Sequence, residues 1–471
     1  MSRKFLVLSA LALGLIVPAS AKVYTRDEAI KTAMENSPEI KTAEEDLIKA
    51  SSQVEAGYGN AYPSIDLNAT VTRIFGLDDV KGGSPMANAA SDMFGKKDED
   101  GNPKANVFDK DVVAPALDNM INGMSTQRYR WQSSVGLTLT QVLYAAGKVG
   151  TAIDIAKAYK HMAEVTLENT KANVRYAVEN LFDQALVLDS TLKTLDESFV
   201  LLNETFEFVK QNVESGLATE LDLARSQLAM DVLLANKKTV EEAAITAKNA
   251  FLLAIGVDYD KEVEFKGELR SPDSNQPFPD TTLANVKKRR REMAIIEATE
   301  TMMEKNIEIE EAGYKPTIAL VGGLKYANNQ NEFYKWDAPK WDKLNKYIAL
   351  NLSMNLFKGM QTKEAIVQAK SSLRNTQIQK ETLERKFRLD VENSVKSLES
   401  IERLLIQLKN QIDLCQRIYE MTDASYKNGM ETQLNLLQAN MDLRNAKLSY
   451  LDAIAKWNKA YNALLLATGE F

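Results

Sequence analysis

Apolar residues between positions 174 and 213 recur in alternating steps of four and three. This spacing is typical of a long helix that packs lengthwise against another helix. The apolar stripe that it forms, here called the seam, is narrower than the stripe of an ordinary globular helix. Gly216 interrupts the pattern three residues after its last position, so we expect the helix to end there in a turn. The seam positions are Val174, Val178, Leu181, Ala185, Leu188, Leu192, Leu195, Phe199, Leu202, Phe206, Val209 and Val213.

The same pattern returns 213 residues further along the chain. Adding this offset to each seam position gives a second seam from Phe387 to Tyr426, and adding it to Gly216 gives Gly429. We therefore predict two tandem repeats, each built around a long antiparallel helical hairpin. The expected ranges are 22–256 and 281–471 for the repeats, and about 147–254 and 359–466 for their hairpins.

Two short stretches ahead of each hairpin alternate apolar and polar residues, which is the period of a β-strand. In the first stretch, Ile65 and Leu67 alternate with Asp66 and Asn68. Stretches of this length with one apolar face match the strands of transmembrane barrels. The expected strands are residues 64–75, 131–143, 317–326 and 347–357, and the residues expected to face lipid include Val135, Leu137, Leu139, Leu350 and Leu352. The alternative is a pair of amphipathic hairpins lying on a soluble helical core.

Residues 1–21 have the pattern of a signal peptide. Arg3 and Lys4 precede a short apolar run, and Ala19-Ser20-Ala21 supplies a cleavage site of small residues. Without this segment the chain carries 56 basic and 65 acidic residues, a net charge of about −9. No later stretch is long and apolar enough to predict a transmembrane helix. If the protein enters a membrane, we expect it to do so with strands.

The remaining segments are assigned from local signals. Thr25 and Glu28 form a capping box that begins one helix, and Ser37 with Pro38 begins the next. The segment that crosses between the repeats is marked by its prolines. The other expected elements are a helix over about 281–313, the crossover over 257–280, a long loop over about 76–130 and a shorter loop over about 328–345.

Composition excludes several classes of function. One histidine and one cysteine in 471 residues argue against a His/Cys metal site and against a Cys–His catalytic pair. Cys415 falls on the second seam and is expected to be a small packing residue. No acid/base cluster indicates an enzyme, no cofactor is expected, and the acidic charge without a basic patch argues against a nucleic-acid partner.

The order of helix, strand pair and long hairpin, twice in succession, resembles the TolC-type outer-membrane factors of tripartite efflux and type I secretion systems. The resemblance covers the whole mature chain, and it depends on an ordered set of motifs. These are Asn36-Ser37-Pro38-Glu39-Ile40, the strand entries Tyr62-Pro63-Ser64-Ile65 and Lys315-Pro316-Thr317-Ile318, and the turns Ser215-Gly216-Leu217 and Asn428-Gly429-Met430 with the residues that follow them.

The resemblance implies a mainly α fold with a transmembrane β part. It implies a homotrimer whose twelve strands form a barrel in the outer membrane, continued by a helical tunnel in the periplasm. Physical chemistry also favours association of several chains, because the four strands of one chain cannot close a barrel and an open sheet edge in lipid leaves backbone groups without hydrogen-bond partners. The implied function is a passive exit duct whose partners are a periplasmic adaptor protein, an inner-membrane pump and outer-membrane lipid. Drug, metal and protein export are not separated, since specificity resides in the pump.

The resemblance also implies roles for the two hairpin tips. Adaptor hairpins are expected to dock beside Gly216-Leu217 and Gly429-Met430. The plainer reading of each glycine is a tight turn that needs a positive φ angle. Both readings are compatible, because the turn itself creates the exposed surface.

The expected gate departs from the family pattern. Asn435 and Gln438 stand six and nine residues after Gly429, where family members carry aspartates that form acidic rings. Tyr426 and Asp222 match the tyrosine and aspartate expected to bond between hairpins, but Glu431 replaces an arginine partner. We expect a closed state held by a Tyr426–Asp222 hydrogen bond and by amide contacts of Asn435 and Gln438. An ordinary solvated helix face is the alternative for these residues. For the whole chain, the alternative is a soluble periplasmic coiled-coil scaffold.

Overall fold

The chain forms two compact units in the computed structural model. The predicted signal peptide over 1–21 lies outside the described residues, as do most of the predicted loop over 76–130 and part of the loop over 328–345. The described residues are 22–75, 129–258, 263–272, 276–330, 332–333 and 344–471. Unit 1 contains the described residues within 22–54, 154–306 and 368–471, and unit 2 contains those within 55–153 and 307–367.

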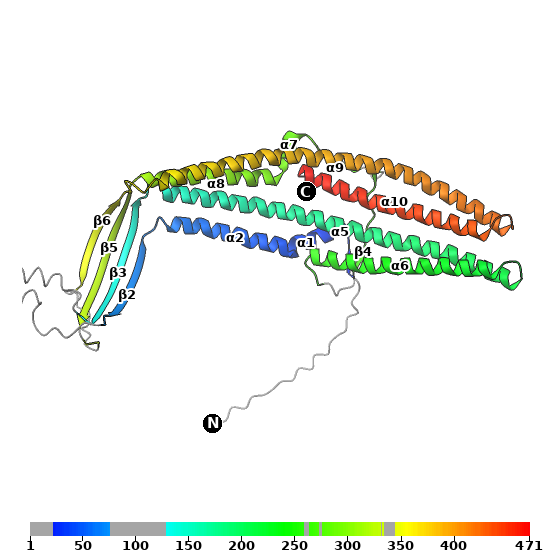
Figure 1. The fold of residues 1–471 in the computed structure, drawn as a ribbon, viewed down its shortest axis with the longest axis horizontal. Coiled ribbons are helices and arrows are strands. Elements are labelled where there is room, and N and C mark those ends of the chain that lie inside the picture. Colours follow the sequence, from blue (N-terminus) through cyan, green and yellow to red (C-terminus); the bar gives the residue numbers. More distant parts are fainter. Residues whose placement is uncertain (1–21, 76–128, 259–262, 273–275, 331, 334–343) are drawn as a thin grey trace, which may run out of the picture. The chain divides into compact units, whose positions relative to one another are not determined.

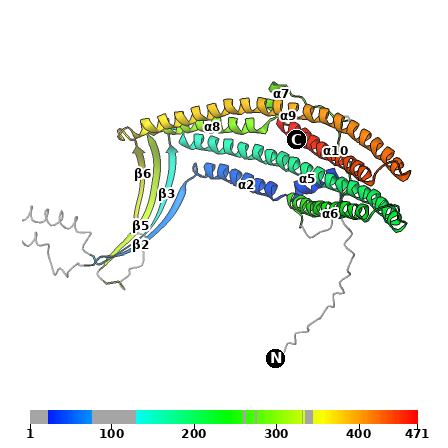
Figure 2. The same cartoon turned by 45° about the vertical axis from the view of Figure 1, so that its right-hand side comes forward.

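Unit 2 is built on one antiparallel sheet (Figures 1 and 2). The strand order is β2-β3-β5-β6, so the two predicted strand pairs join through β3 and β5. Within the described chain, β2 and β6 are edge strands that each have one side without a partner. The strands are β2 (Ser64–Arg73), β3 (Trp131–Tyr144), β5 (Thr317–Gln330) and β6 (Asn345–Ser353).

The last strand ends earlier than the alternation predicts. β6 stops at Ser353, whereas the pattern continued to residue 357. Ser353 pairs with Thr317, and the residue before Thr317 is Pro316, which has no N–H group to extend the ladder. β5 instead runs past its predicted end at residue 326, because its last residue, Gln330, still pairs with Trp131.

The register places the apolar residues of all four strands on one face of the sheet. Leu137 lies between Leu67 and Leu324, and Leu350 pairs with Leu320. The opposite face carries mainly polar and small residues, as the alternation predicts. One position differs: the register shifts between Val142 and Tyr144, so Tyr144, and not Leu143, pairs with Ile318. This bulge leaves Leu143 without a partner of its own in the register, so the strict alternation of β3 ends there.

The two long hairpins are present with nearly the predicted ends (Figure 1). The seam residues Val178 and Leu202 of the first hairpin are buried, as are Phe387 and Leu398 of the second. Cys415 is half-buried on the second seam, where burial raises the pKa of its thiol. The helices are α5 (Lys148–Glu214), α6 (Glu220–Ala254), α9 (Gln361–Lys427) and α10 (Gln433–Thr468).

The N-terminal helices begin where the caps predict. The capping box of Thr25 and Glu28 opens α1 (Arg26–Asn36), and α2 (Pro38–Gly59) follows Ser37. A short parallel pair of β1 (Lys22–Tyr24) and β4 (Val263–Phe265) was not predicted. Each strand has three residues, which is too short to display a period, and parallel partners far apart in sequence leave no local signal.

The single helix predicted over 281–313 is wrong. The structure has α7 (Leu283–Arg289), α8 (Arg291–Glu311) and a 3-10 turn, η2 (Ala312–Tyr314). Arg290 between α7 and α8 has an extended backbone, with a ψ angle of 113°. Its guanidinium donates to the carbonyl oxygen of Ala467 at 3.2 Å and lies 4.3 Å from the centroid of the Phe387 ring. These tertiary contacts outweigh the helical propensity of the segment.

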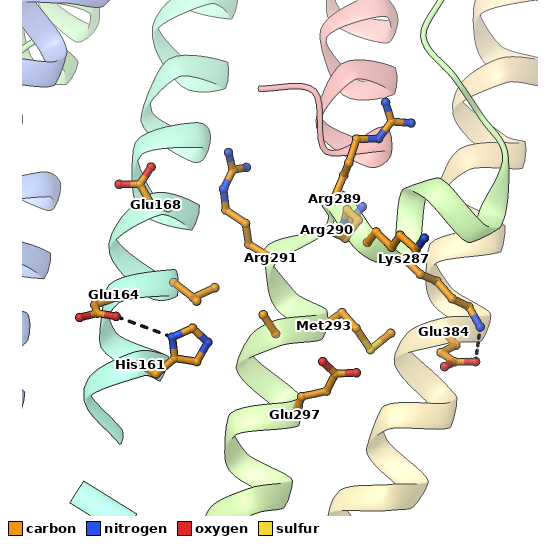
Figure 3. Close-up of a pocket in the computed structure, with 13 residues that line it drawn as sticks. His161, Glu164, Glu168, Lys287, Arg289, Arg290, Arg291, Met293, Glu297 and Glu384 are labelled. Carbon is orange, nitrogen blue, oxygen red and sulfur yellow. Dashed lines mark hydrogen bonds and ion pairs between the residues drawn. The ribbon is translucent and has the colours of Figure 1, made fainter. Parts of the chain in front are cut away.

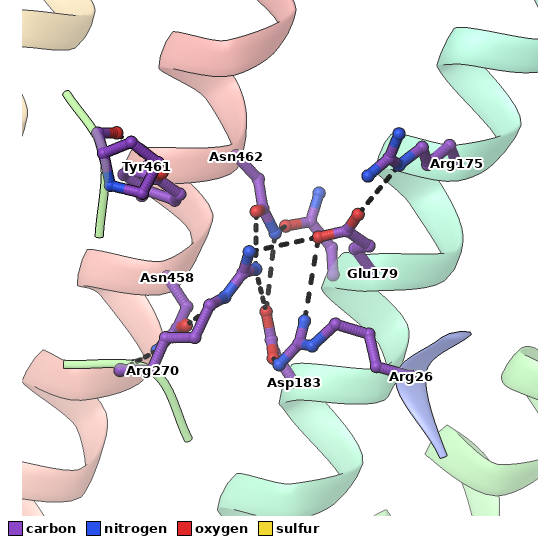
Figure 4. Close-up of polar contacts among 10 residues, drawn as sticks. Arg26, Arg175, Glu179, Asp183, Arg270, Asn458, Tyr461 and Asn462 are labelled. Carbon is purple, nitrogen blue, oxygen red and sulfur yellow. Dashed lines mark hydrogen bonds and ion pairs between the residues drawn. The ribbon is translucent and has the colours of Figure 1, made fainter. Parts of the chain in front are cut away.

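A buried cluster of charges and amides lies inside unit 1 (Figure 4). Glu179 and Asp183 on α5 both contact Arg270, at 3.2 and 3.1 Å. Arg26 at the start of α1 also pairs with Asp183. Arg270 donates to the side-chain oxygen of Asn462 on α10 at 2.6 Å, and Asn462 is fully buried. The cluster therefore ties the N-terminal segment and the crossover to α5 and α10.

None of the helices in the described residues has an apolar stretch long enough to cross a membrane.

Candidate functional site

The two hairpin tips share one backbone geometry. Gly216 and Gly429 have φ angles of 74° and 75°. The N–H of Leu217 donates to the carbonyl oxygen of Asn212 at 2.7 Å, and Met430 makes the equivalent bond to Ser425 at 2.9 Å. A glycine in the left-handed conformation, followed by a hydrogen bond back to the carbonyl group five residues earlier, is the Schellman motif that ends a helix. The prediction of a tight turn with positive φ at both glycines is confirmed.

The helix that leaves each tip starts at a threonine cap. The Thr219 hydroxyl accepts from the backbone N–H of Asp222 at 3.2 Å, and the Asp222 carboxylate accepts from the N–H of Thr219 at 3.2 Å. Thr432 caps α10 in the same way, by accepting from the N–H of Asn435. The amide of Asn435 instead donates to Glu431 at 2.7 Å. The two tips carry different residues at this position, Asp222 and Asn435, so the two side chains form different hydrogen bonds.

The structure brings the two tips together around a cleft of about 680 Å³. Five of the residues predicted for the gate and the docking tips line it, and the surrounding walls include Phe208, Arg225 and Gln433. The five are Leu217, Asp222, Tyr426, Gly429 and Glu431. Residues from the turns of both repeats thus line one cleft.

Tyr426 lines this cleft and contacts a second aromatic side chain. Its ring packs edge-on against Phe208, with 5.7 Å between the centroids. Burial raises the pKa of the Tyr426 hydroxyl, and the negative charge of Asp222 raises it further. The hydroxyl therefore stays neutral and keeps its proton available for a hydrogen bond.

The predicted gate contacts have other partners within a single protomer. The Asp222 carboxylate is held by Thr219, and no Tyr426–Asp222 hydrogen bond forms in the described chain. The Asn435 amide bonds to Glu431 in the turn before α10 at 2.7 Å, and the Gln438 amide bonds to Asp442 on α10 at 2.8 Å. The gate roles of these residues stay predictions for the assembled protein.

Gln433 is a tip residue that sequence reasoning missed. Its side-chain amide donates to the backbone carbonyl of Asp222 at 2.7 Å and to the hydroxyl of Ser226. Gln433 is 5% exposed and Ser226 is 2% exposed. This contact joins the first turn of α10 to the first two turns of α6. No period could mark it, because Gln433 is the first residue of its helix, directly after the Thr432 cap.

The residues expected to face lipid all lie on the apolar face of the sheet. Leu137, Leu350 and Leu352 are exposed there, as are Val135 and Leu139. Their pairing partners include other apolar side chains, so the face is continuous across the four strands. Contact of this face with lipid stays a prediction.

A second groove, of about 670 Å³, lies among α5, α7, α8 and α9 (Figure 3). A basic run from Lys287 to Arg291 lines it, but several of these charges have partners. Lys287 contacts Glu384 at 2.6 Å, and Arg291 donates to the carbonyl oxygen of Phe471 at 2.8 Å. None of the predicted site residues lies in this groove. We interpret this basic run as a set of structural contacts that attach α7 and α8 to the neighbouring helices and to the C-terminal residue.

Comparison with known proteins identifies the family. The model of the outer membrane efflux protein family matches residues 105–257 and 282–470. The chain is 20% identical to the outer membrane protein TolC of Vibrio cholerae over 339 residues, which cover 70% of this chain and 77% of that protein. It is 20% identical to the outer membrane efflux protein BepC of Brucella suis over 342 residues, 73% of each.

A solved structure has the same fold. The CmeC outer membrane channel of Campylobacter jejuni matches with a TM-score of 0.72 at 14% identity, over 94% of this chain and 85% of that one. TolC-type channels are trimeric. The family match excludes the alternative of a soluble periplasmic scaffold. The chain belongs to the outer membrane efflux protein family, and it is an outer-membrane efflux channel of the TolC type with a periplasmic helical part, not an enzyme.

Proposed function

We propose that three copies of this chain form one continuous duct. Twelve strands close the barrel, because β2 of one copy pairs with β6 of the next and no edge remains open to lipid. The two unpartnered edges in the described chain support this arrangement, since an unpaired backbone group in a bilayer costs several kcal/mol. The apolar face of the sheet contacts lipid, and the polar face lines an aqueous lumen.

Conduction is passive in this proposal, and the gate lies at the hairpin tips. The observation that carries the gate is the cleft shared by Asp222, Tyr426 and Glu431. Tyr426 keeps its proton, and the raised pKa of its hydroxyl has Asp222 among its causes. Small changes in the angle between the hairpins would convert this proximity into a hydrogen bond. A neutral bond of this kind contributes ~1 kcal/mol, so the gate opens without a large barrier.

The tips also form the docking surface for a periplasmic adaptor that couples the duct to an inner-membrane pump. Leu217 is 80% exposed and Met430 is 74% exposed, at equivalent positions of the two turns. Large apolar side chains at this exposure mark a surface that a partner covers. A Cβ at Gly216 or Gly429 would meet no atom within 4 Å, so the space beside each turn is open to such a partner.

Single-channel conductance in planar bilayers tests the gate. Tyr426→Phe combined with Asp222→Ala is expected to raise the conductance, because the link between hairpins is lost. Asn435→Asp combined with Gln438→Asp is expected to make conduction sensitive to divalent cations on the periplasmic side, since carboxylates at an entrance attract cations.

Gln416→Asp is the matched control for the carboxylate variants. Gln416 bonds to Glu420 along its own helix at 2.8 Å, as Gln438 bonds to Asp442, but farther from the tip. The control should leave cation sensitivity unchanged. Unaltered conductance in the Tyr426/Asp222 variant, or equal cation sensitivity in test and control, would place the constriction elsewhere.

A further inference from the structure

Two adjacent glycines stand in the middle of β5. Gly322 and Gly323 interrupt a strand that is otherwise rich in larger side chains. Glycine in a strand interior weakens the strand and often marks a place where another group approaches closely. The register puts Gly323 directly opposite Tyr347 on β6. These glycines are not required for the turns or for the strand pairing, so their position calls for another explanation.

The ring of Tyr347 occupies the space above Gly323. A Cβ built on Gly323 would lie 2.7 Å from the Tyr347 hydroxyl oxygen and closer still to two carbons of the ring. Side chains in strands normally stand roughly perpendicular to the sheet. The missing Cβ instead lets the Tyr347 ring lie down across the neighbouring strand. Any larger residue at position 323 would force the ring to move.

Gly322 has the opposite environment. A Cβ on Gly322 would meet only a backbone oxygen at 4.0 Å, which is ordinary contact. Its side of the sheet is the apolar face, where Gly322 borders a shallow groove of about 640 Å³ with Leu137, Leu139 and Ile348 among its walls. A methyl group fits there without displacing a neighbour. The two glycines are therefore a natural pair of test and control positions.

The row that contains Gly323 belongs to the polar face. Across the four strands it reads Asp66, Thr138, Gly323 and Tyr347. Tyr347 is the bulkiest side chain of this row, and it is 47% exposed. In the proposed trimer the polar face lines the lumen, so the row occurs three times around the bore. How far the three tyrosine rings project then decides the free width of the lumen at this level.

We propose that Gly323 is a seat for the Tyr347 ring, and that this pair sets the size limit for solutes in the strand region of the channel. The inference rests on the proposed trimer with its polar face inward. With the ring lying on Gly323, the bore stays wide. With the seat filled, the ring swings away from the sheet toward the axis and narrows the passage. The pair is thus a size-selecting element separate from the gate at the helical tips.

The test measures how fast a thiol placed beyond Tyr347 reacts with reagents added outside intact cells. Asn351→Cys supplies the thiol, because Asn351 lies on the same face and nearer the end of β6 that continues into α9. Cys415→Ser removes the native thiol, which is the only cysteine of the sequence. Membrane-impermeant maleimides of graded size probe the strand region from its outer end, so the tips do not limit the reaction.

Three further variants, each made in the protein that carries Asn351→Cys and Cys415→Ser, test the proposal. Gly323→Ala should lower the modification rate, with a loss that grows with reagent size. Adding Tyr347→Ala to Gly323→Ala should restore the rate, because no ring remains to be displaced. Gly322→Ala should leave the rate at the parent value for every reagent.

Each other outcome overturns the proposal. Equal rates in the parent and Gly323→Ala would show that the seat does not control the bore. A loss that Tyr347→Ala fails to restore, or an equal loss in Gly322→Ala, would show that the ring is not responsible. In these cases the proposed channel stands. A parent thiol at position 351 that resists even the smallest reagent would instead refute the inward polar face, and the inference with it.

Discussion

The contact of Gln433 with α6 predicts a measurable bias of the gate toward its closed form. Gln433→Leu keeps a side chain that can stay buried and removes both hydrogen bonds to the first two turns of α6. A neutral hydrogen bond contributes ~0.5–1.5 kcal/mol. Ser226 retains its own bond to the carbonyl oxygen of Asp222 at 3.2 Å, so the variant leaves no hydroxyl wholly unpaired. The lost stabilisation is therefore at most ~1–2 kcal/mol per protomer, because leucine also removes the Gln433 side-chain oxygen, which is buried and has no partner in the described residues.

This energy converts into an expected change of open probability. Opening that separates the two hairpins breaks these bonds, so at ~1.4 kcal/mol per factor of ten the variant should shift the opening equilibrium by up to roughly 30-fold for each protomer. Single-channel recording measures the open fraction directly. Ser226→Ala removes only one of the two Gln433 bonds and should give a smaller shift in the same direction.

Gln416→Leu is the control for this prediction. Gln416 carries the same side chain on α9, and its amide bonds only to Glu420, one turn further along the helix. Its loss touches no contact between hairpins, so the open probability should not change. An equal change in Gln433→Leu and Gln416→Leu, or no change in either, would refute the reasoning that Gln433 holds the hairpins together.

Three further predictions concern the strands, the tips and the buried cluster. Leu137→Arg should impair membrane insertion by ~2–4 kcal/mol if the residue lies near the bilayer midplane, whereas Thr138→Arg should still assemble, as judged by trimers in the outer-membrane fraction. Replacing Gly216 and Gly429 together by leucine should abolish efflux in a drug-sensitivity or export assay while trimers still form. Arg270→Met should destabilise the helical unit by ~3 kcal/mol, measured by urea-induced loss of circular dichroism, because buried carboxylates lose a partner.

Each of these predictions has an outcome that contradicts it. Equal trimer loss for Leu137→Arg and Thr138→Arg would reverse the strand faces. Normal export by the double glycine variant, with an adaptor still crosslinking at the tips, would remove the docking role. Arg385→Met is the control for Arg270→Met, because Arg385 makes only an exposed pair with Glu381 at 3.8 Å. The same loss of stability in both variants would mean that burial of the cluster does not matter.

The elements that could be predicted from the sequence are those that repeat a period many times. The seam that contains Val178 and Leu202 covers many turns of helix, so its pattern survives single exceptions such as Ser394 and Thr422 in the second repeat. The ends of the helices could also be predicted, because Gly216 adopts the positive φ angle of a helix C-terminus and Thr219 caps the next helix through a local hydrogen bond.

The elements that could not be predicted depend on partners far away in the chain. The break at Arg290 is stabilised by Ala467 and Phe387, which no local pattern connects to it. β1 is too short to show alternation, and its partner β4 lies inside a segment that reads as irregular. At the tips, the resemblance pointed to Tyr426 and Asp222, but Gln433 was invisible because its contact crosses between the repeats.

The buried cluster around Glu179 and Asp183 makes the order of export matter. Arg26 emerges well before these carboxylates, whereas Arg270 and Asn462 follow them, the last by 279 positions for Asp183. A chain delivered to the periplasm N-terminus first therefore lacks the Arg270 partner of both acids until the crossover has arrived, and the Asn462 amide until α10 has arrived. Water solvates them during that interval and opposes premature closure of the helical unit. The cluster is therefore complete only when the N-terminal segment, α5, the crossover and α10 are all present.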